Sequence, residues 1–361
     1  MAGCSIGGDM PPGTEWTAEE SVEVSSSEDT GATDEERFFS MRGRSQAGVR
    51  QLIAFSRENG MRMWSSDILN LCDPPLAVGR RIYCAGSDLR AFDVESGARL
   101  WLLDTDTTFS QVPGAADAER VYAATLTSIV AVDAASGDVV WRRGLSGDGW
   151  VRPNIRALTL SDGDLLVSTE GWYNVNGGLA SAAIVALDPA TGAERWRFED
   201  GGPETRESIG ELTAWNDLLL YADANDEVVA VDRTTREVAW RHESELGFLS
   251  PRRAPRVVDG VVYVAWGDGL AYAIDARTGA RVWRSDTPED ERFSFVSYET
   301  CGPVLLGKRL FDIEAFARAD GRRLGPVIED EQIGQIATAD GFAYVSTERA
   351  VYALDCAAML D

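Results

Sequence analysis

The chain has 361 residues, 44% of them hydrophobic, and its 59 acidic and 34 basic side chains give a formal net charge of −25 at pH 7. Such an acidic chain argues against a nucleic-acid-binding protein, because phosphate backbones are bound by basic faces. No stretch of the sequence is apolar enough to span a membrane as a helix, so membrane attachment would require an anchor.

The first residues, Met1-Ala-Gly-Cys4-Ser, are similar to the end of a bacterial lipobox, in which a small-small-Cys triplet is cleaved before the Cys. Cys4 is therefore the predicted lipidation site, and residues 1–13 are the predicted tether. The basic start and apolar run of a complete signal peptide are missing from this sequence, so we expect a trimmed signal or a gene start further upstream. The alternative is a chance cysteine in a disordered start.

Seven tryptophans then recur along the chain, and the last six each close a copy of one eleven-residue phrase. The clearest copies are residues 91–101, 186–196 and 273–283. The steps between the repeated Asp positions run from about 40 to 55 residues, a period typical of β-propeller blades. The tryptophans are Trp16, Trp64, Trp101, Trp141, Trp196, Trp240 and Trp283.

Each copy is predicted to form a strand, a tight turn and a second strand. The apolar run before the Asp, as in residues 129–132 and 228–231, indicates a buried strand. The Asp carboxylate and the Thr or Ser hydroxyl can hydrogen-bond free backbone N–H groups, and the Gly tolerates a positive φ. The second strand is predicted to end at the Trp, whose ring docks between blades and contributes about 2–3 kcal/mol on burial. The repeat positions are Asp93, Gly97, Trp101, Asp133, Gly137, Trp141, Asp188, Gly192, Trp196, Asp232, Trp240, Asp275, Gly279 and Trp283.

The sequence predicts an all-β fold, an eight-bladed β-propeller of four-stranded antiparallel blades, formed as a single domain by residues 14–361. A further strand signal precedes the copies, as in residues 119–124, 259–264 and 341–345. The seventh copy lacks both the Asp and the Trp, and the eighth stops before its fourth strand, which we expect the segment around Trp16 to supply. Seven blades with an irregular N-terminus is the alternative. The third strands of the blades are predicted to end near Ser56, Asp93, Asp133, Asp188, Asp232, Asp275, Ala317 and Asp355.

The phrase Ala-x-Asp-x-x-Thr-Gly-x-x-x-Trp resembles the tryptophan-docking repeat of pyrroloquinoline-quinone-type β-propellers, and the resemblance covers nearly the whole chain. Two groups of that family differ in function. The quinoprotein dehydrogenases are enzymes, whereas the cofactor-free envelope lipoproteins include the propeller subunit of the outer-membrane β-barrel assembly machinery. The resemblance to that subunit implies eight blades closed by an N-terminal Trp strand, and a lipidated Cys, which is Cys4 here.

Five cysteines fit a lipid anchor at Cys4 and two disulfides. Cys72 and Cys84 fall on adjacent predicted strands of the second blade, about three residues out of register, and Cys301 and Cys356 would tie the seventh blade to the end of the eighth. Disulfides would indicate an oxidising envelope compartment. The alternative is four buried free thiols.

Residues suited to catalysis are scarce. His242 is the only histidine and is predicted to lie exposed in a loop after Trp240, so no Ser-His-Asp triad and no metal-ligand cluster can be assembled. Gly177-Gly178 does not open a helix and is no nucleotide motif. The quinoprotein dehydrogenases carry calcium ligands and a catalytic Asp, and none of these positions can be carried over to this chain. We therefore predict a protein that is not an enzyme and has no metal or cofactor.

Binding is expected on one face of the disc. The short turns within blades share one face, and the longer loops share the other, where binding residues concentrate. Trp, Tyr and Arg are enriched at binding hot spots. The candidate partner contacts are Trp150, Trp172, Tyr173, Phe248, Arg252 and Arg253. Alternatively, Trp172 and Tyr173 pack only against their own loop.

These observations predict a non-catalytic scaffold of the bacterial cell envelope. It would be anchored to the outer membrane at its periplasmic face and act as a monomer within a complex. The resemblance implies a role in outer-membrane protein assembly, with barrel-assembly components as partners and no nucleic acid. The alternatives are a quinone-dependent oxidoreductase and a sensor that binds a sugar or peptide in the central channel.

Overall fold

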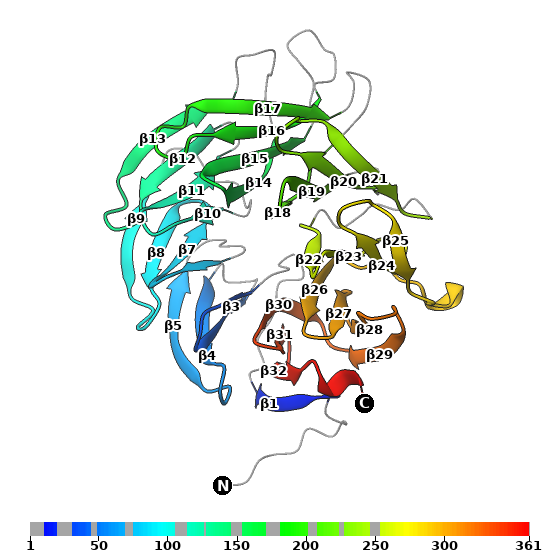
Figure 1. The fold of residues 1–361 in the computed structure, drawn as a ribbon. Helices are drawn as coiled ribbons and strands as arrows, with labels where there is room; N and C mark the ends of the chain where they lie inside the picture. The colour runs from blue at the N-terminus through cyan, green and yellow to red at the C-terminus, as the bar shows by residue number, and fades with distance from the viewer. Residues whose placement is uncertain are drawn as a thin grey trace.

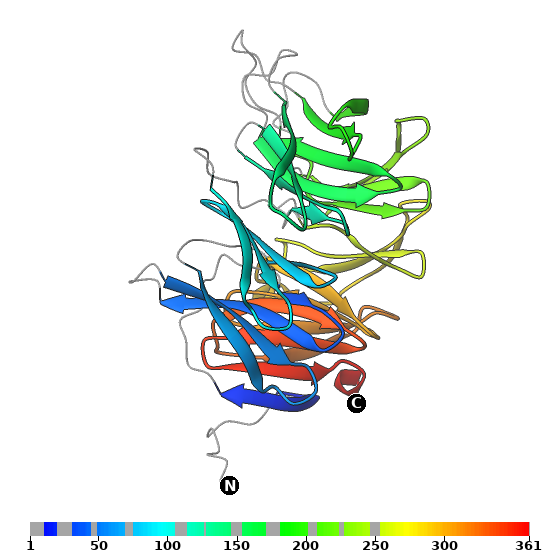
Figure 2. The same ribbon diagram turned by 90° about the vertical axis from the view of Figure 1, so that its left-hand side faces the viewer.

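The computed structural model describes residues 11–19, 31–44, 49–68, 75–104, 114–125, 128–145, 154–170, 181–200, 208–223, 227–245 and 253–360. In this part of the chain the strands form eight four-stranded antiparallel sheets. The blades follow one another round a ring, and the colour in Figure 1 passes from blue to red in the same order. Figure 2 shows the same sheets from the side.

Blades 1 to 4 each use four consecutive strands, named A to D from first to last. Blade 1 is β2 (Ala32–Thr33), β3 (Arg37–Arg44), β4 (Val49–Ser56) and β5 (Arg62–Ile68). Blade 2 is β6 (Leu76–Val78), β7 (Arg81–Ala85), β8 (Leu89–Asp93) and β9 (Arg99–Leu103). Blade 3 is β10 (Ala115–Ala116), β11 (Arg120–Ala124), β12 (Ser128–Asp133) and β13 (Val139–Gly144). Blade 4 is β14 (Asn154–Ser161), β15 (Asp164–Glu170), β16 (Ala182–Leu187) and β17 (Glu194–Asp200).

Blades 5 to 7 repeat this order, and blade 8 combines the two ends of the described chain. Blade 5 is β18 (Leu212–Trp215), β19 (Leu218–Ala222), β20 (Glu227–Asp232) and β21 (Val238–Glu243). Blade 6 is β22 (Arg256–Val258), β23 (Val261–Ala265), β24 (Ala271–Asp275) and β25 (Arg281–Arg284). Blade 7 is β26 (Ser297–Cys301), β27 (Val304–Lys308), β28 (Ile313–Ala317) and β29 (Arg323–Ile328). Blade 8 is β30 (Ile333–Ala339), β31 (Phe342–Thr347), β32 (Ala350–Asp355) and β1 (Thr14–Glu19). Two short 3₁₀ helices are η1 (Glu289–Glu291) and η2 (Ala358–Leu360).

The predicted eight-bladed propeller is confirmed, and the seven-bladed alternative is wrong. Every predicted C strand is present and ends within one residue of its predicted end. The closing strand is also confirmed, because β1 pairs antiparallel with β32 and places Trp16 opposite Ala353. Within the described residues, no helix is long and apolar enough to cross a bilayer.

The prediction that the D strand ends at its Trp is wrong. In blade 2, β9 continues beyond Trp101 to Leu103. The strand continues because the start of β8 still has partners there: Arg90 pairs with Leu102 and Leu89 with Leu103. A β-bulge precedes the Trp, since Phe92 pairs with Arg99 and Ala91 with Trp101, so Leu100 is an extra residue in the outer strand. The bulge changes the face on which the side chains of the strand lie. The same register shift recurs in blades 1 and 3 to 7.

The turn between C and D has the predicted chemistry. In blade 3, Asp133 Oδ1 accepts the backbone N–H groups of Ala135 and Ser136 at 3.0 and 2.8 Å. Gly137 has φ +82° and donates its N–H to the Asp133 carbonyl at 2.9 Å. Because a Cβ at Gly137 would lie 2.8 Å from Trp101 Cδ2, only glycine lets the ring of the preceding blade approach this turn.

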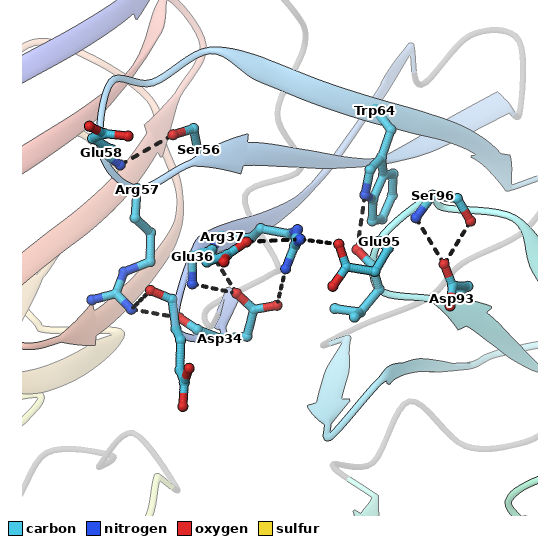
Figure 3. A network of polar contacts seen from close by, with 12 residues as sticks. Asp34, Glu36, Arg37, Ser56, Arg57, Glu58, Trp64, Asp93, Glu95 and Ser96 are labelled. Atoms are coloured by element: carbon cyan, nitrogen blue, oxygen red, sulfur yellow. Dashed lines mark hydrogen bonds and ion pairs between the residues drawn. The ribbon is translucent and has the colours of Figure 1, made fainter.

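Six of the tryptophans form the same joint with the next blade. Their indole N–H groups donate to the carbonyl of a residue one or two positions after the C strand of that blade, at 2.8–3.1 Å. Figure 3 shows one such joint, with Trp64 above the turn that begins at Asp93. There Arg37 pairs with Asp34 of its own blade at 3.0 Å and also with Glu95 of the next blade, so it bridges the two blades. The pairs are Trp16 with Arg57, Trp64 with Val94, Trp101 with Ala134, Trp141 with Pro189, Trp240 with Ala276 and Trp283 with Arg318.

The joint between blades 4 and 5 differs. Arg236, with φ +60°, occupies the position that is Gly in most of the other turns. Trp196 donates its indole N–H to Asp164 of its own blade at 3.0 Å. The Arg236 guanidinium lies 5.7 Å from the centre of the Trp196 ring, which is a cation–π contact in place of the close Gly contact.

The joint between blades 7 and 8 has a disulfide instead of a tryptophan. Gly325 takes the Trp position, since it pairs with Ala315 as Trp283 pairs with Ala273. Cys301, at the end of β26, is disulfide-bonded to Cys356, which directly follows β32. This is the pair expected from the sequence. Cys84 is disulfide-bonded too, but Cys72, its predicted partner, lies outside the described residues.

Candidate functional site

The two faces of the disc carry different connections between strands. The A–B and C–D turns of a blade lie together on what we call the turn face, and they are hydrogen-bonded to each other. For example, Ala134 N–H donates to the Glu119 carbonyl at 2.8 Å. The D–A and B–C connections share the opposite face, the loop face. It carries the longest connections between strands, which are D–A connections such as the one between β25 and β26. Binding residues concentrate on loops that a rigid scaffold positions.

Most of the predicted partner contacts cannot be placed. Cys4 and five of the six predicted contacts lie outside the described residues, so their roles stay predictions. These five residues are Trp150, Trp172, Tyr173, Phe248 and Arg252.

Arg253 is the predicted contact that the structure does place, and its guanidinium is engaged within the protein. It forms an ion pair with Glu211 at 3.0 Å, and its carbonyl accepts the hydroxyl of Tyr298 at 3.1 Å. Burial raises the pKa of Tyr298, which keeps this hydroxyl a donor. These contacts connect blades 5, 6 and 7, so a partner that used Arg253 would have to share it with Glu211.

A pocket of about 420 Å³ lies among the A strands of blades 6, 7, 8 and 1. Arg256 and Glu299 form an ion pair in its wall, and the Glu299 carboxylate raises the pKa of Arg256. The remaining lining is mostly small and hydroxylic: Gly31, Thr33, Thr300, Ile336, Ala337 and Thr338. Because A strands of neighbouring blades contact one another around the ring, the pocket belongs to the central channel.

The lining of this pocket does not fit the quinone of the related dehydrogenases. That cofactor carries several carboxylates, which require cationic partners. Arg256 is the cationic side chain of the pocket, and it is already neutralised by Glu299. The pocket suits a small, uncharged polar molecule or water better than a polyanion.

His242 is not an exposed loop residue as predicted; it lies half-buried in β21. Its Nδ1 lies 2.9 Å from the Gly279 carbonyl of blade 6, and its ring stacks on Trp266 at 6.2 Å between centres. The reason is strand alternation, because His242 lies two residues after Trp240 and so faces the same neighbouring blade. That spacing is the signal that the sequence analysis missed.

The residue two positions after the Trp has the same role in two other blades. Ser66 donates to the Gly97 carbonyl, and Arg143 donates to the Gly192 carbonyl at 3.1 Å. His242 therefore belongs to the set of side chains that hold the joints together. In the described part of the chain, no group of three or more His, Cys, Asp or Glu residues could hold a metal ion.

Known proteins of several kinds match parts of this chain. The serine/threonine-protein kinase AfsK of Streptomyces griseus is 36% identical over 110 residues, 29% of this chain and 14% of the kinase. The outer membrane protein assembly factor BamB of Yersinia pestis is 26% identical over 219 residues, 55% of this chain and 52% of that protein. The chain thus matches about half or less of each of these relatives.

Solved structures show the same fold over nearly the full chain. The crystal structure of BamB from Moraxella catarrhalis has a TM-score of 0.69 at 18% identity and covers 93% of this chain and 97% of that one. The quinohemoprotein alcohol dehydrogenase of Comamonas testosteroni has a TM-score of 0.67 at 14% identity and covers 94% of this chain and 76% of that one. At these identities the two likenesses show the fold alone.

The family assignment rests on a longer match. The family model described as outer membrane protein assembly factor BamB matches residues 12–176 and 180–308. This range begins ahead of β1 and ends with β27, so it includes most of the ring. The chain therefore belongs to the family of the outer membrane protein assembly factor BamB.

Proposed function

We propose that this protein is a non-catalytic scaffold of the bacterial cell envelope that takes part in outer-membrane protein assembly. The observation that carries the proposal is the match of the assembly-factor family over residues 12–176 and 180–308. Two structural facts support a binding role over a catalytic one. His242 is used in a joint between blades, and the cation of the channel pocket is paired with Glu299.

The proposal includes an anchor and a binding face. Lipidation of Cys4 would attach the protein through the tether of residues 1–13 to the periplasmic face of the outer membrane, and residues 14–361 would form the propeller domain. Barrel-assembly components would bind the loop face, as a rigid disc displays its loops without changing shape. The protein would act as a monomer within that complex.

Purification from native membranes tests this proposal. The gene, expressed with its own upstream region and a C-terminal tag, is compared with a Cys4→Ser variant. We expect the wild type to carry an acylated Cys4 by intact mass and to recover barrel-assembly components. We expect the variant to leave the membrane fraction. An unmodified Met1 in the soluble fraction, without envelope partners, would overturn the proposal.

The oxidoreductase alternative has a separate test. Purified protein would be mixed with pyrroloquinoline quinone and Ca²⁺ and followed by absorbance and calorimetry. Saturable binding with dye reduction in the presence of an alcohol would establish the enzyme. The paired Arg256 leads us to expect neither signal.

A further inference from the structure

An apolar patch lies exposed on the loop face at blade 7. It consists of Phe293 and Val296, which lie between β25 and β26, and Leu310 and Phe311, which lie between β27 and β28. Phe293 is 63% exposed and Phe311 is 55% exposed. Leu310 and Val296 are exposed to 40% and 39%. We call these four residues the Phe patch. Contiguous exposed apolar residues rimmed by polar ones are typical of interaction sites.

Buried side chains hold one side of the Phe patch in place. Arg309 is 7% exposed, donates its Nε–H to the Phe293 carbonyl at 3.2 Å, and places its guanidinium 5.7 Å from the centre of the Phe293 ring. The same guanidinium pairs with buried Glu314 at 3.0 Å. Val296 N–H donates to the Lys308 carbonyl at 2.8 Å. A surface that is fixed in advance loses little conformational entropy when a partner binds.

Backbone hydrogen bonds fix the other side. Ile333 N–H donates to the Leu310 carbonyl at 3.0 Å, and Glu331 N–H donates to the Phe311 carbonyl at 3.2 Å. The segment between β29 and β30 is thereby held against the loop that carries Phe311. It brings two exposed carboxylates, Glu329 and Asp330, next to the patch.

A second pair of carboxylates precedes the patch in the chain. Glu289 and Asp290 of η1 are exposed, a few residues before Phe293. We call Glu289, Asp290, Glu329 and Asp330 the acidic rim. Their neighbour Glu291 is tied to Arg323, whereas for the four rim carboxylates the described part of the chain shows no ion pair. The rim therefore presents unneutralised negative charge beside an apolar centre.

We propose that the Phe patch and its acidic rim bind a segment of a partner protein that has apolar side chains flanked by Lys or Arg. The inference rests on the proposed scaffold function and adds the place and chemistry of one docking site. An apolar centre within a polar rim is the usual anatomy of a protein interface, and basic flanks would complement the rim.

Charge distinguishes this occupant from two others. A second copy of the chain would bring the same rim and a net charge of −25 against the patch. A membrane surface containing anionic lipids would be repelled by the rim carboxylates. Both remain defined outcomes of the test below.

Peptide binding measures the predicted chemistry directly. Fluorescence anisotropy would compare a labelled peptide with a Leu-Phe-Leu centre and Lys flanks against the same centre with Glu flanks. We expect the full-length protein to prefer the Lys-flanked peptide by roughly tenfold or more, since like charges at an interface are repelled. The preference should fall with rising salt. Equal binding of the two peptides would overturn the proposal.

Two sets of variants separate the patch from the rim. Phe293→Ser with Phe311→Ser should weaken binding of the Lys-flanked peptide about tenfold or more, because buried aromatics dominate interface energies. Neutralising the rim, with Glu289→Gln, Asp290→Asn, Glu329→Gln and Asp330→Asn, should weaken it less and reduce its salt dependence. Val282→Ser, at a 55% exposed position on β25, is the matched control and should have no effect. An equal loss in the control would contradict the assignment.

Photo-cross-linking identifies the occupant in cells. With p-benzoylphenylalanine at Phe311, the cross-linked segment read by mass spectrometry should be apolar with basic flanks. Cross-links only to this chain or to lipid would overturn the proposal.

The native-membrane purification is repeated with the Phe293→Ser, Phe311→Ser variant. In one outcome, the wild type recovers no assembly components and still prefers the Lys-flanked peptide. That result would overturn the proposed scaffold function but would support the proposed docking site.

Discussion

The joint between blades 2 and 3 and the joint between blades 7 and 8 occupy equivalent places in the ring but are built differently. In the first, the Trp101 ring covers Gly137, and its indole N–H donates to the Ala134 carbonyl at 3.0 Å. In the second, Gly325 replaces the Trp, and Cys356 follows β32 as Ala134 follows β12. A covalent bond from Cys356 to Cys301 thus replaces a hydrogen bond and ring packing.

This difference shows that each joint needs a contact between one blade and the turn after the C strand of the next blade. The contact can be a tryptophan ring or a disulfide. A Trp reaches from the outer D strand, whereas the disulfide starts at the end of the inner A strand β26. Blade 8 therefore has a disulfide on one side and Trp16 with Arg57 on the other. The repeat can degenerate in blade 7 because its contact is supplied elsewhere.

Removing the ring of a Trp joint should have the largest effect. Trp101 is 8% exposed, and we expect Trp101→Ala to lower the free energy of unfolding by about 3–5 kcal/mol, because it leaves a cavity between two blades. Urea unfolding followed by circular dichroism measures this. Trp101→Phe keeps most of the packing and should lose less, and equal losses would show that packing is not the main contribution.

Breaking the disulfide joint should have the next largest effect. Cys301→Ser with Cys356→Ser should lower the free energy of unfolding by about 2–4 kcal/mol, the usual range for a disulfide. The two positions are 55 residues apart in sequence, and the same urea experiment under non-reducing conditions measures the loss. Reductant should leave the Trp joints intact, so adding it to the double variant should affect only the disulfide that contains Cys84. A double variant as stable as wild type would show that the joint does not need the bond.

A matched pair of glycine substitutions isolates the contact between ring and turn. Gly137 and Gly163 have similar φ values, +82° and +79°, but a Cβ at Gly163 would meet no atom within 4 Å. Both alanine variants carry the cost of a positive φ, roughly 1–2 kcal/mol. Only Gly137→Ala also displaces the Trp101 ring, so we expect its urea midpoint to be clearly lower. Equal midpoints would show that the ring tolerates the added carbon.

Acid should weaken the Asp-based turn slightly. Hydrogen bonds from the backbone N–H groups of Ser136 and Ala135 lower the pKa of Asp133. The stabilisation is therefore fully present above the pKa of the unfolded chain, about 4, and is lost as pH falls through the folded value. The stability difference between wild type and Asp133→Asn should shrink as pH falls from 7 to 3. Asp133→Ala removes the acceptor, so part of its loss should persist at every pH.

The sequence predicted those parts of the fold that depend on one short repeated motif. A C strand, its Asp turn and the following Trp lie within eleven residues, so each blade could be counted and Trp16 assigned to the last one. The bulge at Leu100 was missed because an extra residue in a strand leaves no mark in a hydrophobic pattern.

The site was predictable only in part. Arg253 was chosen as an exposed contact, but its partner Glu211 lies 42 residues away in sequence, and only the ring brings them together. The Phe patch was missed for the same reason, because Phe293 and Phe311 belong to connections of different strands and to no repeat. Distant pairs of this kind follow from the closed ring and not from any local pattern.

The hydrogen bonds around Gly13 also determine how a pulling force on the N-terminal segment is transmitted through the protein. Asp355 N–H donates to the Gly13 carbonyl at 2.7 Å, and β1 continues from Thr14 along β32. Tension applied to the chain ahead of Pro11 is therefore borne first by a row of hydrogen bonds. It then passes through Asp355 to Cys356 and across the disulfide to β26. A pull on the N-terminal side is thus shared by two blades, so the force needed to peel β1 away should fall when the disulfide is removed.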